Sequence, residues 1–250
     1  MDEKNRKTSQ GFWEATHAAK PRMRLPSGLV VGTRNLLRIL RANVRPGMRV
    51  LELGFAPGKQ LAYLAGRLGA EVSGIDYSHA GVEHARDLFS SLGLKGDMRC
   101  EDFFKASFPR ASFDLVYSVG VVEHFDDPKD LIRLHVEFAC PGGIAIVLIP
   151  NYGGIYGRLQ RYFDPENLSI HNLNMMNVKA FASLAPHDLA RGVHGFRVGR
   201  INPGLVSFHR RWPRPLTLLT TLVVNGIGLL QFMDIGPLCP MLGLRILRKA

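Results

Sequence analysis

Hydrophobic positions along the chain fall into blocks whose spacing switches between that of strands and that of helices. From residue 48 to residue 151, short continuous apolar runs typical of buried strands alternate with segments in which apolar side chains recur every three or four residues. The expected strands read RVLELG, EVSGID, MRCEDF, FDLVYSVGVV and GGIAIVLIPN. Because such alternation builds βαβ units with right-handed crossovers, this region predicts a parallel sheet covered by helices.

The flanking regions complete the expected sheet. Residues 1–27 are expected to form an arm. Residues 152–192 mix helical and loop patterns, and this segment is expected to cover the substrate that accepts a transferred group. Within 195–250, GFRVGRIN predicts a sixth strand, and residues 204–250 predict a C-terminal helix followed by a last strand, LGLRILRK, that returns antiparallel. We therefore predict an α/β fold, Rossmann-like and doubly wound, with a mostly parallel seven-stranded sheet and an antiparallel last strand. It forms one domain, 28–250, whose cofactor-binding core spans 45–151.

An uncharged stretch runs from Pro215 to Met233 behind the basic, tryptophan-containing segment 209–214. Its length is close to the minimum of about 20 residues that spans a bilayer, but threonines and amides dilute its apolar character. Three interpretations stay open: a helix buried against the domain, a lid or interfacial helix, and a transmembrane span. The second would give a peripheral membrane contact through 209–233 and would suit a lipophilic acceptor.

Composition narrows the class of protein. The chain has 250 residues, of which 46% are hydrophobic, enough for one sizeable core but not for two full α/β domains. Its three cysteines, Cys100, Cys140 and Cys239, form neither a zinc pattern nor an even disulfide framework. The polar N-terminus carries no secretory signal pattern, so a cytoplasmic location is expected.

The formal net charge of +11 is dispersed along the chain. A solvated basic surface explains such a charge, and so does contact with phosphates of nucleic acid or of an anionic membrane. No arginine-rich run alternates with aromatic residues, so we do not expect nucleic acid as a partner. The sequence does not indicate an oligomeric state.

The end of the first strand carries a ligand-binding turn. Gly54 and Gly58, with the small Ala56 between them, let the backbone approach a ligand without interference from a Cβ atom. Pro57 is expected in the first turn of the following helix, whose exposed N–H groups suit an anionic group such as a carboxylate. A dinucleotide fingerprint would need glycine at 54, 56 and 59, and Ala56 and Lys59 stand there instead, which disfavours a pyrophosphate.

Polar residues follow the next two strands as well. Asp76 ends the second strand and can accept hydrogen bonds from a ribose diol, while Tyr77 beside it can stack on a purine. Asp102 and Phe103 follow the third strand, where a carboxylate would suit an exocyclic amine. The glycine turn and the polar residues after the second and third strands follow one another in strand order. Together they predict an adenosine-containing ligand across the sheet edge.

These motifs resemble those of the class I S-adenosylmethionine-dependent methyltransferases. VLELGFAPGK resembles their first motif, GIDYS the acidic ribose motif and CEDFF the adenine motif. FDLVYSVGVVEHFDDP and CPGGIAIVLIPN resemble the motifs of the fourth and fifth strands, especially in the ubiquinone-biosynthesis O-methyltransferase-like subgroup. The chain departs from the family at Ala56, where glycine is usual, and a methyl group there should leave cofactor binding intact.

The resemblance implies S-adenosylmethionine as cofactor, with S-adenosylhomocysteine as product. It implies that Glu52, Gly54 and Gly58 frame the methionine moiety, that Asp76 holds the ribose, and that Asp102 and Phe103 hold the adenine. The full predicted cofactor-binding set is Glu52, Gly54, Phe55, Ala56, Gly58, Asp76, Tyr77, Asp102, Phe103 and Val119.

Two histidines are candidate bases for the chemistry. Methyl transfer from a sulfonium chiefly requires alignment, but a hydroxyl or protonated amine acceptor also requires a proton acceptor. His124 follows the fourth strand, and His171 lies in the loop region after the fifth, where related enzymes cover the acceptor. For each, a structural or surface role is the alternative.

We expect no required metal. Some relatives bind a divalent metal through a Glu-x-x-Glu-His arrangement, but Gly120 replaces the first glutamate here. The remaining Glu123 and His124 make a poor site for a hard cation.

Three functional classes remain in view. The first is transfer of a methyl group to an oxygen or nitrogen of a small, lipophilic metabolite, in quinone, lipid or secondary metabolism. The second is an RNA or protein methyltransferase, which the basic charge favours, although no asparagine-proline-proline-aromatic signature follows the fourth strand. The third is a non-catalytic partner protein that binds the cofactor. Ala56 in the first motif and the missing acid at Gly120 are the features that favour this class.

Overall fold

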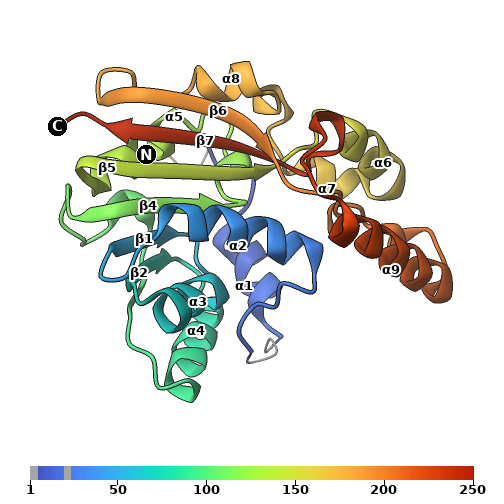
Figure 1. Ribbon diagram of the computed structural model, residues 1–250, viewed down its shortest axis with the longest axis horizontal. Coiled ribbons are helices and arrows are strands. Elements are labelled where there is room, and N and C mark those ends of the chain that lie inside the picture. Colours follow the sequence, from blue (N-terminus) through green and yellow to red (C-terminus); the bar gives the residue numbers. More distant parts are fainter. Residues whose placement is uncertain (1–4, 20–23) are drawn as a thin grey trace.

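A computed structural model describes residues 5–19 and 24–250, and its centre is a seven-stranded sheet (Figure 1). The strands run in the order β3-β2-β1-β4-β5-β7-β6, and β7 pairs antiparallel with both β5 and β6. The other pairings, among β1 to β5, are parallel. The predicted fold class is therefore confirmed. The strands are β1 Arg49–Leu53, β2 Glu71–Asp76, β3 Asp97–Cys100, β4 Phe113–Val119, β5 Ala139–Pro150, β6 Ala190–Val198 and β7 Met241–Arg248.

Helices cover both faces of this sheet, and a separate apolar core fills the space on each side. On one face α2, α3 and α4 pack against side chains such as Val50 and Val72, which point away from the other core. On the opposite face α5 and α8 pack against Leu51, Val116 and their neighbours. The helices are α1 Gln10–His17, α2 Val31–Asn43, α3 Lys59–Leu68, α4 His79–Ser91, α5 Lys129–Phe138, α6 Ile155–Phe163, α7 Pro165–Ser169, α8 Val178–Ala182 and α9 Arg214–Leu230.

The ends of several elements differ from expectation for local reasons. Helix α3 begins at Lys59 because Gly58, in a left-handed conformation, is its N-cap. Pro57 therefore precedes the helix, and the prediction that it occupies the first helical turn is wrong. The third strand stops at Cys100, where Asp102 caps a 3-10 turn, Phe103–Lys105, by accepting a hydrogen bond from the Phe104 N–H. Both differences lie at the sheet edge where the predicted ligand site is formed.

Segment 152–189 lies between β5 and β6 and carries α6, α7 and α8. The two ends of this segment pack differently: α8 lies against the sheet, whereas Tyr156 and Phe163 of α6 form a small third core with Phe208. Asn151, which follows β5, donates to the Cys239 carbonyl and so ties the start of the segment to the chain that leads into β7. The segment is therefore fixed at the carboxyl edge of the parallel strands.

Helix α9 projects from the body of the protein (Figure 1), and of its seventeen residues only Gly228 is buried. The interpretation of this stretch as a buried helix is therefore wrong. Among residues 5–19 and 24–250, none of the helices combines the length and the apolar character needed to cross a bilayer.

Candidate cofactor and catalytic site

The turn between β1 and α3 requires glycine at two positions. Gly54 has a φ of 74°, and a Cβ atom there would lie 2.5 Å from Cγ2 of Val121. Gly58 has a φ of 82°, and its Cβ would lie 2.6 Å from the Cβ of Ala85 in α4. Since L side chains rarely adopt such φ values, both the conformation and the space exclude larger residues. The turn consequently keeps its backbone open toward the carboxyl edge of the sheet.

Asp76 at the end of β2 holds this turn in place. Its Oδ2 accepts a hydrogen bond from the Ala56 N–H and its Oδ1 one from the Ser78 N–H, both at 3.0 Å. Burial raises the pKa of the Asp76 carboxyl, while these two amide donors act in the opposite direction. Each oxygen retains a lone pair, because a carboxylate accepts about four hydrogen bonds. The side chain can therefore brace the turn and bind a diol at once.

A cavity of about 110 Å³, open to solvent, lies beside these residues at the carboxyl edge of the parallel strands. Several of the predicted site residues line this cavity, so the residues that follow the different strands meet around one space. They are Gly54, Ala56, Asp76, Tyr77, Phe103, Val119 and His124. Seven further residues that the sequence interpretation did not include complete the lining. They are Arg6, Thr8, Trp13, His17, Gly120, Val121 and Phe125.

Two residues of the predicted cofactor-binding set point elsewhere. The Phe55 side chain is buried in the core between β2 and α3, so its predicted cofactor contact is left to its backbone alone. Glu52 is also buried, and Tyr117 of the adjacent β4 donates a 2.7 Å hydrogen bond to its carboxyl. Burial raises the pKa of Glu52 well above its ordinary value, as expected for a carboxyl without a cationic partner. Its position is beneath the turn rather than along the cavity.

Asp102 lies beside the cavity and pairs with an arginine of the N-terminal arm. Arg6 Nη2 lies 2.7 Å from Asp102 Oδ2, and the guanidinium also sits 5.1 Å from the ring centre of Tyr77. The carboxylate predicted to meet an exocyclic amine thus has a cation as its partner in this structure. Asp102 and Tyr77 also line a second hollow on the outer side of Arg6. Access to Asp102 from the cavity therefore depends on the position of Arg6.

The N-terminal arm forms part of the cavity wall and pairs with the segment that carries His124. The Lys7 N–H donates to the His124 carbonyl at 2.8 Å, and the Asp126 N–H donates to the Asn5 carbonyl at 2.9 Å. Trp13 then meets the His124 ring edge-on, with 5.2 Å between ring centres. The aromatic pair Phe12 and Trp13 in the arm is the one signal in the sequence that could have indicated this contact.

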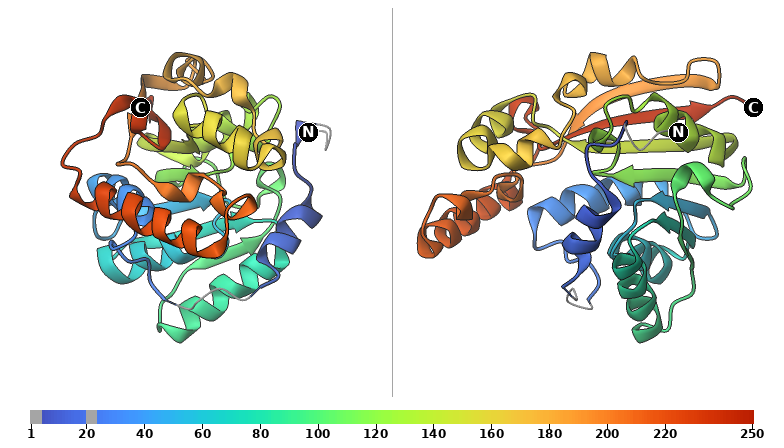
Figure 2. Two further views of the ribbon diagram at one scale, coloured as in Figure 1. Left: turned by 90° about the vertical axis from the view of Figure 1, so that its right-hand side faces the viewer. Right: turned by 180° about the vertical axis from the view of Figure 1, so that it is seen from behind.

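Helix α1 is anchored to the start of α4 through one carboxylate. Glu14 accepts hydrogen bonds from the N–H groups of His79 and Ala80 and from the Ser78 hydroxyl. These donors belong to the first turn of α4, whose N–H groups have no partners within the helix. The arm helix thus lies against α4 in the structure (Figure 2). Sequence spacing gives no indication that Glu14 caps α4, because Glu14 and the start of α4 are far apart in the chain.

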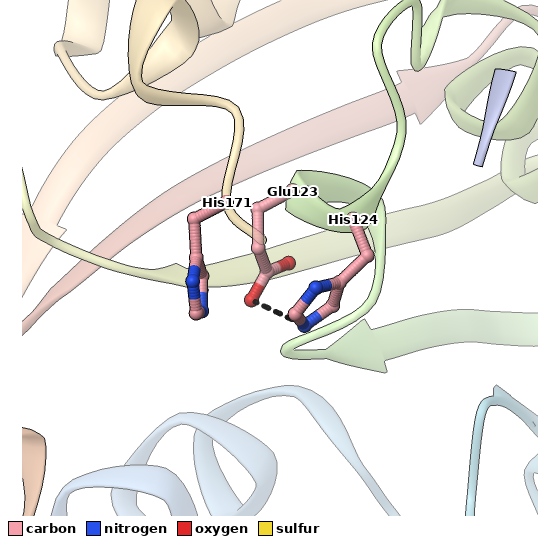
Figure 3. A group of neighbouring side chains, drawn as sticks. All are labelled: Glu123, His124 and His171. Atoms are coloured by element: carbon pink, nitrogen blue, oxygen red, sulfur yellow. Dashed lines mark ion pairs between the residues drawn. The ribbon is translucent and has the colours of Figure 1, made fainter. Parts of the chain in front are cut away.

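His124 and His171 are brought side by side, with 4.7 Å between their ring centres (Figure 3). The Nδ1 atom of His124 lies 2.9 Å from the Ile170 carbonyl, and that of His171 lies 2.7 Å from the Asn167 carbonyl. Since a carbonyl only accepts, Nδ1 carries the proton in each neutral ring and Nε2 keeps a lone pair. Burial lowers the pKa of His124 to about 4 and also lowers that of His171. Both rings are therefore neutral at physiological pH.

Glu123 lies between the two imidazoles (Figure 3). Its Oε1 is 4.0 Å from His124 Nε2, and its Oε2 is buried without a hydrogen-bond partner among the described residues. Burial raises the pKa of the Glu123 carboxyl to about 8, so it carries a proton at neutral pH. One ligand-capable atom from each of Glu123, His124 and His171 lies within 4.8 Å of the others. The expectation that Glu123 and His124 alone could offer metal ligands here is wrong, because tertiary packing adds His171.

Comparison with known proteins identifies the central part of the chain. Residues 51–147 match the family described as "Methyltransferase domain". Tocopherol O-methyltransferase of Arabidopsis thaliana is 33% identical over 102 residues, which cover 40% of this chain and 29% of that protein. The ubiquinone biosynthesis O-methyltransferase of Ruegeria pomeroyi is 34% identical over 100 residues, which cover 40% of each chain. The chain thus spans well under half the length of these curated relatives.

Solved structures extend the likeness to nearly the whole chain. The phosphoethanolamine N-methyltransferase 2 of Haemonchus contortus, in complex with S-adenosyl-L-methionine, aligns with a TM-score of 0.64. The alignment covers 96% of this chain and 58% of that one at 14% sequence identity. At this identity the likeness concerns the fold.

Proposed function

We propose that this chain, whose residues 51–147 match the family described as "Methyltransferase domain", is an S-adenosylmethionine-dependent methyltransferase that methylates an oxygen or nitrogen of a small, lipophilic metabolite. The observation that carries the proposal is the meeting of two features around one cavity. Asp76 and Gly54 of the glycine turn line this cavity together with His124. We assign Asp76 and the turn to a cofactor half of the site and His124 to a catalytic half.

The residues of the cofactor half fit S-adenosylmethionine, which when bound supplies a methyl group on a positively charged sulfur. The Cβ-free approach at Gly54 leaves room for close backbone contact, and Asp76 keeps acceptor capacity toward a ribose diol. Tyr77 and Phe103 add aromatic surface for the adenine, with ring centres 6.2 Å apart. The roles of Asp102 and Val119 in holding the cofactor are part of the same proposal.

The catalytic half would accept the proton that the acceptor loses. The Nε2 lone pair of His124 is available because the Ile170 carbonyl fixes the proton on Nδ1. His171 is the second candidate base, and its ring is held by the Asn167 carbonyl and by an edge-on contact with Tyr152 at 5.0 Å. Glu123 is buried between them, and burial raises the pKa of its carboxyl to about 8, so it would not compete with the imidazoles as a base at neutral pH.

The acceptor class is proposed from the relatives and from the surroundings of the site. Two relatives are named for the lipophilic compounds tocopherol and ubiquinone, of which tocopherol carries a phenolic hydroxyl. A phenolic hydroxyl is an acceptor that needs a base. Residues 152–192 are proposed to cover this acceptor, and residues 209–233 to give a peripheral membrane contact. A cytoplasmic location and the absence of a nucleic-acid partner stay predictions.

Titration of the full chain with S-adenosylmethionine and S-adenosylhomocysteine in a calorimeter tests the cofactor half. We expect micromolar binding of both, and we expect S-adenosylhomocysteine to form with hydroquinone or catechol acceptors. Binding without turnover on phenols, amines, RNA or protein would instead assign a non-catalytic role. Turnover on RNA or protein alone would contradict the acceptor class, and no binding at all would contradict the proposal as a whole.

We predict that methyl transfer requires no metal, although Glu123, His124 and His171 are close enough to share one. The sulfonium donor is intrinsically activated, so alignment and a base suffice. After dialysis against EDTA, turnover should stay within about twofold of the untreated protein, since general-base catalysis needs only the neutral imidazole. A loss of turnover that zinc or magnesium restores would contradict this prediction and assign the three side chains to metal binding.

A further inference from the structure

Helix α9 exposes an apolar face that no other part of the described chain covers. Leu218 and Leu222 are 59% and 61% exposed, and Leu230 is 76% exposed. The apolar face of α9 consists of these residues together with Leu216, Leu219, Val223, Ile227 and, just after the helix, Phe232, Met233 and Ile235. An exposed apolar patch of this extent on a small domain marks an interaction surface.

The opposite side of the helix is fixed to the domain by polar contacts. Asn225 accepts a hydrogen bond from the Val31 N–H at the start of α2 and donates one to the Leu29 carbonyl. At Gly228 a Cβ atom would lie 2.4 Å from the Ile201 carbonyl oxygen, so the helix approaches the domain backbone closely. Gln231 accepts from the Ile201 N–H. The apolar side is therefore held outward by the fold and is not the product of a loosely placed helix.

Positive charge borders this face, and the one acidic residue within it, Asp234 between Met233 and Ile235, is paired with Arg38 in α2. From Leu189 to Met233 the sequence contains six arginines and neither aspartate nor glutamate. At the start of α9, Arg211 and Arg214 are exposed, and the Arg211 guanidinium lies 4.7 Å from the ring centre of the exposed Tyr162 in α6. A second copy of this chain would bring arginine against arginine, whereas an anionic lipid surface complements both the charge and the apolar face.

We infer that the apolar face of α9 and its arginine border dock onto an anionic phospholipid bilayer, with the helix lying in the interface. Its side chains are leucine, valine, isoleucine, phenylalanine and methionine, which need no hydrogen-bond partners and suit acyl chains. Arg211 and Arg214 lie where they would meet lipid phosphates. With seventeen residues, the helix does not combine the length and apolar character needed to cross the bilayer, in keeping with an interfacial position.

Docking through α9 also orients the site. The helix extends from the edge of the sheet at which the parallel strands end (Figure 1), which is the edge that carries the cavity. Trp212 at the base of α9 stacks on Phe208, and this aromatic cluster continues through Tyr152 to the ring of His171. If the proposed methyl transfer holds, the acceptor would be one that partitions into the bilayer, but docking itself does not depend on catalysis.

Flotation of the full chain with lipid vesicles tests the inference. We expect binding to equimolar phosphatidylcholine–phosphatidylglycerol vesicles and, because each arginine near the surface adds to the attraction, about tenfold weaker binding to pure phosphatidylcholine. Leu218→Ser combined with Leu222→Ser should weaken binding about a hundredfold, since two leucines would no longer leave water. Arg211→Gln combined with Arg214→Gln should remove most of the preference for the anionic vesicles.

Leu92→Ser is the matched control, because Leu92 is an exposed leucine at the end of α4, outside the apolar face of α9, and its loss should not change vesicle binding. Circular dichroism and calorimetric cofactor binding establish that each variant is folded. Two results would overturn the inference: wild-type protein that does not float with anionic vesicles, or equal flotation of the double serine variant. A dimer in sedimentation that only the double serine variant loses, without vesicle binding, would instead assign the face to a second copy.

Discussion

Asp76→Asn is expected to weaken S-adenosylmethionine binding by about a hundredfold, because a hydrogen bond to a charged acceptor contributes about 1.5–3 kcal/mol and the amide loses acceptor capacity. The effect would be large because this carboxylate has two tasks. It accepts hydrogen bonds from the N–H groups of Ala56 and Ser78, and it lines the cavity where the ribose diol is proposed to lie. Isothermal titration calorimetry with S-adenosylhomocysteine measures the change directly.

Asp130→Asn serves as the control for removal of a negative charge, because Asp130 is exposed in the first turn of α5, remote from the cavity lining. Its cofactor affinity should equal that of the wild type. A thermal melt separates lost affinity from lost structure, since Asp76→Asn retains the shape of the side chain. Unchanged affinity in a folded Asp76→Asn protein would show that the cofactor lies elsewhere.

His124→Ala and His171→Ala are expected to lower kcat, with the larger loss, about a hundredfold, at the residue that acts as the base. The dissociation constant for S-adenosylhomocysteine should stay the same in both, because neither imidazole belongs to the proposed cofactor half. His187→Ala is the matched control, since His187 is an exposed histidine outside the site. Normal turnover in both His124→Ala and His171→Ala would disprove the catalytic assignment.

The pH dependence of kcat gives an independent check on the base. An ordinary imidazole would give a rate that rises through pH 6.5. Because burial holds the pKa of His124 at about 4, this ring is already neutral at pH 5, so the acid limb of the profile should lie below that value. A rate that instead titrates near pH 6.5 would point to a solvated histidine as the base.

The sequence by itself determined the fold class and which strand-end residues meet around the cavity at the sheet edge. Both rest on local signals: apolar runs that alternate with helical periodicity, and glycines or acids placed directly after strands. Parallel strands bring their carboxyl ends to one edge, so residues as far apart as Gly54, Asp76 and Phe103 had to meet there once the sheet was recognised. The sequence did not determine where the side chains of Glu52 and Phe55 point. Alternation along a strand does not tell whether a side chain at its end faces the cavity or the core beneath the sheet.

Only the tertiary structure decided what surrounds that edge. The contact of His171 with His124, the pairing of Arg6 with Asp102 and the capping of α4 by Glu14 join segments with no shared local pattern. The apolar stretch 215–233 shows the same limit, because its composition suits a buried helix equally well. Its outward position follows from contacts of Asn225 and Gln231 with distant backbone. Local periodicity fixes which elements form, whereas long-range packing fixes which of their faces remain uncovered.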